Sequence, residues 1–398
     1  MNMSLYKNDF LLADSNYLLN HSVGRPLKTI EKAFKDSFLS PWQNSGKEPW
    51  ANWLDVINNF QLALSSLFNA PAVEFCPQVN LSSSLTKILM SLVPLNKDNV
   101  VILMSEIDFP SMGFVLQKAL HKSAEIRFID KSVDITDANV WQQHLTKDID
   151  LVFVSKAYSN TGQLAPIREV ISLAKEQNII SVLDIAQSAG VIPLNLQDVR
   201  PNFMIGSSVK WLCAGPGAAY LWVNPDIIEQ CQPKDVGWFS HENPFEFDVH
   251  HFNYNQSAMK FWGGTPSITP FALASHSINY FATLGSIEDR GSRESRGSRE
   301  SRSSRDNRGA SCVRAHNQSM IDLIVDEFDT EIMSPLNKDT RSGTVILDFK
   351  DKQTVIMEAL SHANISVDAR HLGMRVSAHI YNNSDDIQQF IDVVKQHY

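Results

Sequence analysis

The stretches SVLDIAQSAGVIPLNL (181–196) and FMIGSSVKWLCAGPGAAYLWV (203–223) decide the fold of this chain. Each contains an almost wholly apolar run, of the kind found in strands of a parallel sheet that is covered on both faces. Asp184 follows the first run, and Lys210 follows the next run along the chain. Because ligands of open α/β sheets bind at the carboxyl ends of the strands, we expect both side chains beside one ligand site.

The residue types at these two positions suit one cofactor. Lys210 lies between Val209 and Trp211, ahead of a Gly-Pro-Gly turn. Loss of solvent there would lower the pKa of its amine and free it for Schiff-base chemistry with an aldehyde. Asp184 is the kind of group that holds a pyridine nitrogen protonated, so that the ring withdraws electrons. Together the two residues predict pyridoxal 5'-phosphate as cofactor, and no metal site is expected.

Apolar runs alternate with helical patterns, such as the one at residues 167–177, along most of the chain. This alternation predicts an α/β fold with a mostly parallel sheet between helices. Runs at 344–349 and 374–379, and a helix at 385–397 that Ser384 would cap, predict a second, smaller α+β unit. The runs expected as strands of the larger sheet are 100–104, 151–155, 179–186, 203–208 and 218–223.

Composition argues against several classes of protein. The 398 residues are 43% hydrophobic and 20% charged. No apolar run reaches the ~18 residues of a membrane span, and no basic leader opens the chain, so we expect a soluble cytoplasmic protein. Four cysteines at irregular spacings predict neither disulfides nor a zinc site. The net charge of -9 argues against nucleic-acid binding.

One segment differs from the rest in composition. From Arg290 to Arg308 an arginine recurs at every third position, and no aliphatic or aromatic residue occurs. Such a segment buries too little apolar surface to offset its ordering entropy, so we expect a disordered insertion at about 289–311. The expected domains are residues 1–274, with the N-terminal segment and the cofactor site, and residues 275–398, which the insertion interrupts.

Nine motifs follow one another along the chain: YLLNHSVGRP (17–26), VNLSSSLTKIL (79–89), EIDFPS (106–111), YSNTGQ (158–163), DIAQSAG (184–190), SSVKW (207–211), GWFSH (237–241), GGTPSI (263–268) and MRVSAHIYN (374–382). In these motifs the chain resembles the fold-type I pyridoxal-phosphate enzymes of aminotransferase class V, and among them the kynureninases. The resemblance implies a seven-stranded sheet of the aspartate aminotransferase type and a homodimer with shared active sites. It makes Lys210 the lysine bonded to the cofactor, Asp184 the partner of the pyridine nitrogen and Gln187 a neighbour of the ring hydroxyl.

The resemblance implies further contacts to the cofactor. Ser82, Ser83 and Ser84 at a helix start would hold the phosphate, although serines also cap helices there. Phe109 would stack on the pyridine ring, with a core phenylalanine as the alternative. Thr265 would reach the phosphate in the neighbouring subunit, whereas its Gly-Gly-Thr-Pro turn by itself indicates only a tight loop. The resemblance also assigns cofactor contacts to Thr161, Ser207 and Trp238.

Substrate contacts are expected from four side chains. The planar fork of Arg375 suits the α-carboxylate of an amino acid, and the alternative is a salt bridge across the domain boundary. Trp238 and His241 offer an aromatic wall and an imidazole to an aryl or carbonyl group, and the alternative is a packed loop. The resemblance adds Asn20 to this set.

The chain also departs from the kynureninase pattern. Those enzymes carry a tyrosine directly before the cofactor lysine, where this chain has Val209, and a histidine at the place of Gln187. A positioned acid–base group contributes ~100- to 10,000-fold in rate, so we expect kynurenine to be a poor substrate.

The expected function is that of a kynureninase-like enzyme, which hydrolyses a Cβ–Cγ bond of its amino-acid substrate. One alternative is transamination or β-elimination of another amino acid. An alternative from a different class is a noncatalytic or RNA-associated protein that uses the arginine-rich segment.

Overall fold

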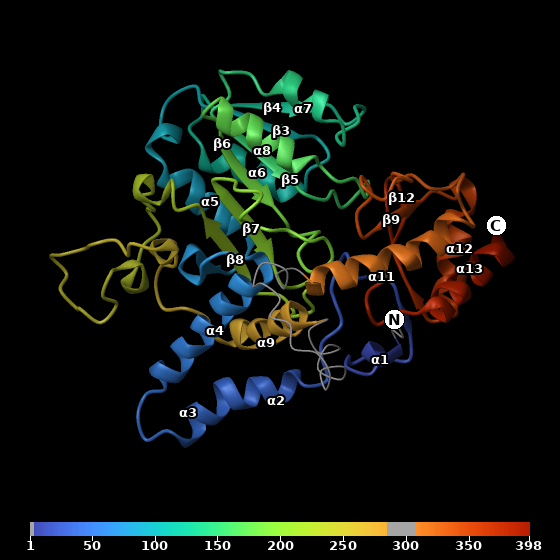
Figure 1. Cartoon of the computed structure of the whole chain (residues 1–398), viewed down its shortest axis with the longest axis horizontal. Coiled ribbons are helices and arrows are strands. Elements are labelled where there is room, and N and C mark those ends of the chain that lie inside the picture. The colour runs from blue at the N-terminus through green and yellow to red at the C-terminus, as the bar shows by residue number, and fades with distance from the viewer. Residues whose placement is uncertain (1–3, 285–307) are drawn as a thin grey trace, which may run out of the picture.

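The larger body of the chain is built on a seven-stranded sheet with the strand order β2-β8-β7-β6-β5-β3-β4 (Figure 1). The computed structural model describes residues 4–284 and 308–398. Neighbouring strands run parallel, except that β8 is antiparallel to both β7 and β2. The predicted α/β class is therefore confirmed. The strands are β2 (Phe75–Gln78), β3 (Val101–Ser105), β4 (Glu125–Ile129), β5 (Leu151–Ser155), β6 (Ile180–Asp184), β7 (Phe203–Ser207) and β8 (Ala219–Val223).

All five predicted runs form strands of this sheet, because each one buries apolar side chains on both faces. The strands β2 and β4 were not predicted from the sequence. β2 contains Pro77 and Gln78, which are rare inside strands. β4 lies at the edge of the sheet, and its Glu125 and Phe128 are exposed.

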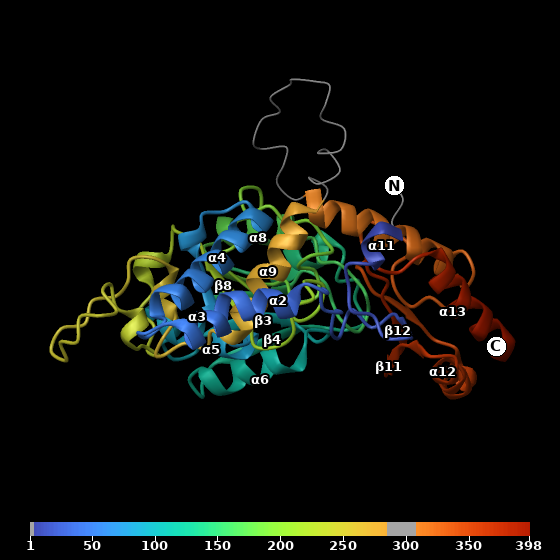
Figure 2. The same ribbon diagram turned by 90° about the horizontal axis from the view of Figure 1, so that it is seen from below.

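Helices cover both faces of the sheet, and Figure 2 shows the two layers. The helices α4 (Trp50–Phe68), α8 (Ile167–Glu176) and α9 (Thr269–Thr283) share one buried apolar cluster with the sheet. On the other face, α5 (Leu81–Ser91) and α6 (Pro110–Ala119) share a second cluster with it. The remaining helices of this body are short: α2 (Ile30–Phe34), α3 (Ser40–Asn44) and α7 (Ala138–His144). None of the helices within 4–284 or 308–398 combines the length and hydropathy needed to cross a membrane.

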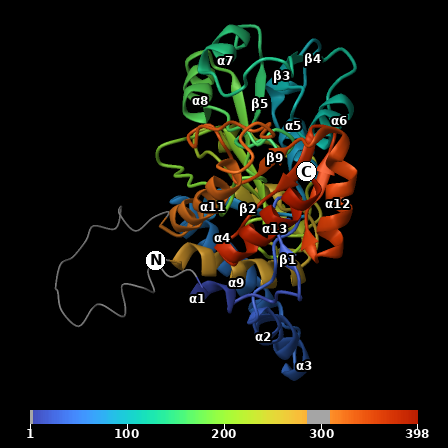
Figure 3. The same ribbon diagram turned by 90° about the vertical axis from the view of Figure 1, so that its right-hand side faces the viewer.

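The smaller body has its own apolar cluster and a three-stranded antiparallel sheet in the order β11-β12-β9. Its first core residue, Leu18, comes from the N-terminal segment, which follows α1 (Ser4–Lys7). In that segment β1 (Asn16–Tyr17) pairs in parallel with β10 (Ile365–Ser366), and Figure 3 shows it against the smaller body. The other elements are α11 (Arg308–Val325), β9 (Val345–Leu347), α12 (Gln353–His362), β11 (Asp368–Arg370), β12 (Gly373–Val376) and α13 (Ser384–His397).

The predicted last helix is present, but its predicted cap is wrong. Ser384 is already the first helical residue of α13. The cap is Asn383, whose side chain accepts a hydrogen bond from the backbone N–H of Asp386 at 2.9 Å. In return, the Asp386 carboxylate accepts the backbone N–H of Asn383 at 3.1 Å. This reciprocal pair satisfies two backbone donors, whereas Ser384 could have satisfied only one.

Most of the predicted insertion lies outside the described residues, but its last part does not. Residues 308–311 belong to α11, so the prediction of disorder is wrong there. The reason is close packing: a Cβ on Gly309 would lie 1.8 Å from the carbonyl oxygen of Phe281 in α9, and Ala310 is buried. The expected boundary between residues 274 and 275 falls within α9, whose buried residues on both sides of it belong to the core of the larger body.

Candidate active site

A cavity of about 290 Å³ opens at the carboxyl ends of β5, β6 and β7. These strands are adjacent and parallel, so their ends meet at one edge of the sheet, as the sequence predicted for Asp184 and Lys210. The lining brings together six of the expected cofactor residues: Ser82, Phe109, Asp184, Gln187, Ser207 and Lys210.

Asp184 is the last residue of β6, and its side chain is almost completely buried. Burial raises the pKa of Asp184 to about 6, although the N–H of Ala186, which donates to Oδ1 at 2.7 Å, and the charge of Lys210 oppose the shift. A carboxylate in this setting gains stability from any cation or protonated nitrogen that enters the cavity.

Lys210 follows β7, and its amine lies 6.0 Å from the centroid of the Phe109 ring. Burial lowers the pKa of Lys210 to about 8 even though the Asp184 carboxylate opposes this, and the charges of Arg375 and Arg370 lower it further. At pH 7 roughly a tenth of the amine is therefore unprotonated and nucleophilic, far more than for an ordinary lysine.

A second buried lysine shows why the pKa alone does not identify the site. Burial lowers the pKa of Lys156 to about 7. Its amine, however, donates to the carbonyl oxygen of Pro193 at 2.6 Å and does not line the cavity. Lys210 does line the cavity, and within the described residues no hydrogen bond holds its amine. Of the two lysines, only Lys210 is placed to react with a ligand in the cavity.

One polar atom in the cavity wall, Gln187 Oε1, is buried without a hydrogen-bond partner among the described residues. The amide nitrogen of Gln187 is fixed, because it donates to the carbonyl oxygen of His21 at 3.2 Å. An unpaired buried acceptor costs about 1–3 kcal/mol, so Gln187 Oε1 calls for a donor from a ligand.

The start of α5 borders the cavity through only one of the three expected serines. Ser82 lines the cavity, Ser84 is buried and donates to the carbonyl oxygen of Asn80 at 2.9 Å, and Ser83 does not reach the lining. The helix cap is Asn80, which the sequence analysis missed; its side chain accepts the N–H of Ser83 at 2.8 Å. The Ser82 hydroxyl and the positive end of α5 are the features that suit an anion.

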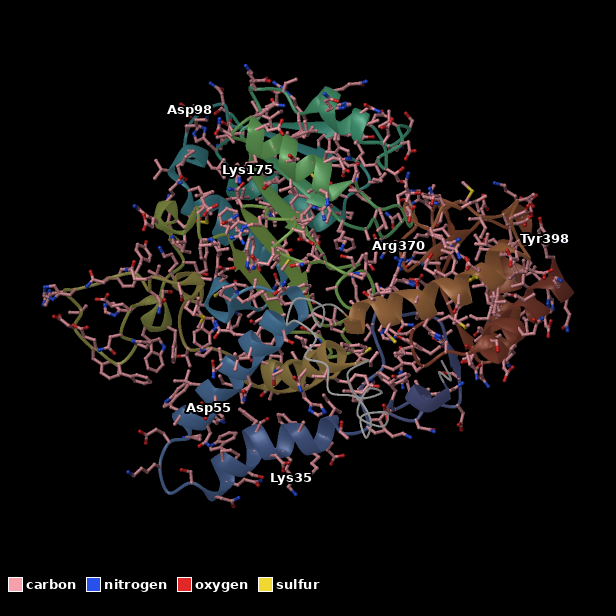
Figure 4. All side chains as sticks on the ribbon, viewed as in Figure 1. Lys35, Asp55, Asp98, Lys175, Arg370 and Tyr398 are labelled. Atoms are coloured by element: carbon pink, nitrogen blue, oxygen red, sulfur yellow. The ribbon has the colours of Figure 1, made fainter. Side chains whose placement is uncertain are left out.

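Phe109 is not a core residue, because its side chain is 42% exposed at the start of α6. The guanidinium carbon of Arg370 lies 5.9 Å from the centroid of its ring. Arg370 also donates to Asn160 Oδ1 at 3.1 Å, and Figure 4 places it where the smaller body faces the larger one. The sequence analysis missed Arg370, because no local pattern distinguishes it from a surface arginine.

Four of the expected residues lie away from this cavity. Thr265 is exposed on a loop, and Thr161 accepts the N–H of its neighbour Gln163 at 3.3 Å. Trp238 and His241 line a separate hollow, in which the Trp238 ring packs against Phe239, with 4.3 Å between centroids. The roles expected for Trp238 and His241 stay predictions, because this hollow is separate from the cavity of Asp184 and Lys210.

The two expected substrate residues from the ends of the chain are already engaged. Arg375 is buried and forms a salt bridge with Asp368 within the smaller body, not across the boundary. The Asn20 amide donates to the carbonyl oxygen of Ser377 at 2.8 Å and accepts the Tyr381 hydroxyl. Both polar groups of this buried amide have partners inside the fold, and contact of Asn20 with the substrate stays a prediction.

Comparison with known proteins agrees with this geometry. The model of the family Aminotransferase class-V matches residues 55–390. A kynureninase of Shouchella clausii is 24% identical over 99% of this chain and 91% of its own length. A kynureninase of Pseudomonas fluorescens is 24% identical over 67% of this chain and 65% of its own. Among solved structures, a variant of C-DES with glycine covalently linked to its pyridoxal-phosphate cofactor shares the fold, with a TM-score of 0.81, 16% identity and coverage of 97% of this chain and 98% of that one.

Proposed function

Because this chain belongs to the aminotransferase class-V family, we propose that it is a pyridoxal-phosphate enzyme that acts on an amino acid by kynureninase-like hydrolysis of a Cβ–Cγ bond. The observation that carries the proposal is that Asp184 and Lys210 line one buried cavity at adjacent strand ends. Relatives that are named kynureninases, at about one quarter identity, favour this reaction.

The residues of the cavity fit this cofactor. Lys210 would bind its aldehyde covalently, Asp184 would pair with its ring nitrogen, and the unpaired Gln187 Oε1 would accept its ring hydroxyl. Ser82 and the start of α5 would hold the phosphate, and Phe109 would cover the ring. When bound, the cofactor supplies a ring that withdraws electrons from the substrate Cα.

The side chains of this chain would then handle protons and charge. The amine of Lys210 would accept the proton from the substrate Cα, since its pKa of about 8 suits a base near neutral pH. Asp184 would hold the proton on the ring nitrogen throughout. Arg370 and Arg375 would supply positive charge to the substrate carboxylate, because both lie close enough to Lys210 to lower its pKa.

Val209 favours a second candidate reaction, transamination or β-elimination of another amino acid. Val209 lines the cavity directly beside Lys210 and offers no hydroxyl for proton transfer. Hydrolysis of kynurenine requires protonation of the leaving carbon as well as delivery of water, and the wall lacks that donor at this position.

Assays of the unmodified enzyme and of Val209→Tyr with kynurenine and 3-hydroxykynurenine test the proposal. We expect slow release of anthranilate-type products by the unmodified enzyme and a kcat about tenfold higher in Val209→Tyr, with a smaller change in KM, because the new hydroxyl is a proton donor. The second candidate reaction would replace hydrolysis if neither protein released anthranilate-type products and if another amino acid gave a keto acid or ammonia.

Arg370→Ala is expected to raise KM about tenfold and to change kcat less. The reason is the loss of a positive charge beside Phe109 and near Lys210, since hydrogen bonds to charged groups contribute ~1.5–3 kcal/mol. The matched control is Arg127→Ala on β4, whose exposed guanidinium pairs with Glu125 far from the cavity. Equal KM values for the two variants would remove Arg370 from the substrate site.

The proposal includes a cytoplasmic homodimer with shared sites. The loop around residues 245–252 exposes large apolar side chains that a second copy would cover, with Phe247 83% and Val249 91% exposed. Sedimentation of the full chain at the mass of a single copy would contradict this part.

A further inference from the structure

Arg375 and Asp368 face each other across the hairpin of β11 and β12. Nε of Arg375 donates to Asp368 Oδ1 at 2.8 Å, and Nη2 donates to Oδ2. The remaining nitrogen, Nη1, makes a long contact of 3.4 Å with the carbonyl oxygen of Ser159, a residue that lines the cavity. Asp368, a residue of the smaller body, thus holds the edge of the guanidinium that is formed by Nε and Nη2.

A count of donors shows which edge remains for a ligand. A guanidinium has five N–H groups, one on Nε and two on each terminal nitrogen. Asp368 takes the N–H of Nε and one N–H of Nη2, and the carbonyl oxygen of Ser159 takes one N–H of Nη1. The outer edge, with one N–H from each terminal nitrogen, is the pair left to bind a carboxylate in bidentate fashion.

His21 fixes Asp368 in turn. Its Nε2 lies 2.8 Å from Asp368 Oδ1, and its Nδ1 lies 2.7 Å from the hydroxyl of Ser377. Burial lowers the pKa of His21 to about 4, so the ring is neutral near pH 7. Because a carboxylate only accepts, Nε2 must carry the proton, which leaves Nδ1 as an acceptor beside the Ser377 hydroxyl.

Asp368 is ionised in this arrangement. Burial opposes its charge, but the hydrogen bonds from His21 and Arg375 outweigh burial and hold the pKa of the carboxyl well below its usual range. The result is a fixed anion with three donated hydrogen bonds, two from Arg375 and one from His21.

His21 also contacts a residue of the cavity wall. Its carbonyl oxygen accepts the amide of Gln187, whose Oε1 is the unpaired acceptor in the wall. The segment around His21 is fastened to the smaller body, since the N–H of Ser377 donates to the carbonyl oxygen of Leu18 at 2.9 Å. One residue of the N-terminal segment therefore connects the wall of the cavity with the arginine of the smaller body.

We propose that Asp368, braced by His21, is a positioning residue that presents the outer edge of Arg375 to the α-carboxylate of the amino-acid substrate. The inference rests on the proposed function, because it assumes a substrate with that carboxylate. Asp368 itself does not touch the substrate.

Asp368→Asn in the cofactor-loaded enzyme tests the proposal. Calorimetry measures the affinity for L-kynurenine and L-alanine, and for the α-amide of each, while steady-state assays measure KM and kcat. The unmodified enzyme should prefer each acid to its amide. In Asp368→Asn the affinity for the acids should fall about tenfold to a hundredfold, because a small displacement of the Arg375 guanidinium weakens its bonds to the carboxylate. The affinity for the amides should stay within about twofold.

The matched control is Asp322→Asn. Asp322 pairs with Arg341, another buried arginine of the smaller body, at 2.8 Å. No hydrogen bond among the described residues joins this pair to a residue of the cavity wall, whereas Arg375 contacts Ser159 there. Urea unfolding of both variants measures the loss of stability, and only Asp368→Asn should lose the preference for acids. His21→Ala leaves the Asp368–Arg375 pair intact, so it should lose a smaller part of the preference even if Asp368→Asn does not fold.

Several outcomes would overturn the proposal. These are an unmodified enzyme with no preference for acids, an unchanged preference in the folded variants, or an equal loss in Asp322→Asn. A gain of affinity for acids in Asp368→Asn would show that Asp368 competes with the substrate for Arg375, which also overturns it. Failure of the proposed function looks different: kynurenine would not be hydrolysed, although L-alanine would still bind better than its amide.

Discussion

Lys210→Ala should leave the enzyme without a covalent bond to pyridoxal phosphate and should lower turnover on the order of 10⁴-fold. Two losses add up, since the variant lacks both the amine that holds the cofactor aldehyde and the base that faces the substrate Cα. The visible absorbance of the purified protein, borohydride reduction followed by peptide mapping, and single-turnover rates measure these effects.

Lys156 provides the control for this prediction. Its pKa of about 7 is below that of Lys210, so more of the Lys156 amine is unprotonated at a given pH. An aldehyde that reacted only according to this fraction would therefore attach to Lys156. We expect the reduced cofactor on Lys210, because only its amine faces the cavity. The rate of cofactor loading should rise as the pH rises through about 8, since only the unprotonated amine attacks an aldehyde. Recovery of the cofactor on Lys156 would invalidate the assignment.

Much of the larger body could be predicted because its strands are buried on both faces. Such strands appear in the sequence as unbroken apolar runs, as at Leu151–Ser155. The prediction weakens wherever burial is one-sided or the chain is polar. The edge strand β4 and the Pro-containing strand β2 are of that kind. At α13, Asn383 and Ser384 are both good caps, and only the hydrogen bonds distinguish them.

The candidate site could be predicted where its residues follow strands and not where it depends on contacts between distant segments. Asp184 and Lys210 stand at strand ends, so the topology alone brings them together. Arg370 comes from the smaller body to lie over the ring of Phe109, 261 positions away in the chain (370 minus 109), and nothing local marks it. The hydrogen bond between Asn20 and Tyr381 could not be predicted for the same reason, since the two residues are 361 positions apart.

Asp184→Asn should reduce turnover by several orders of magnitude while the cofactor still binds covalently to Lys210. The amide can keep the hydrogen bond from the N–H of Ala186, so the local backbone should not move. It is neutral, however, and cannot hold a protonated ring nitrogen, which removes the electron sink that the reaction depends on. Cofactor affinity, the visible spectrum and kcat, measured on one preparation, separate binding from chemistry.

Asp108→Asn is the matched control, because it removes a second buried carboxyl, which follows β3 on the other side of β5 from β6. Burial raises the pKa of Asp108 to about 7, although the Ser155 hydroxyl donates to its Oδ1 at 2.6 Å and opposes the shift. Asp108 does not line the cavity. Both substitutions replace an acid by its isosteric amide, so their effects on stability should be similar, whereas only Asp184→Asn should abolish turnover. If the two variants were equally active, a buried carboxyl near the ring would matter only for the fold, and Asp184 would have no part in the chemistry. If Asp184→Asn alone is inactive but still holds the cofactor on Lys210, then what the reaction requires at the end of β6 is negative charge.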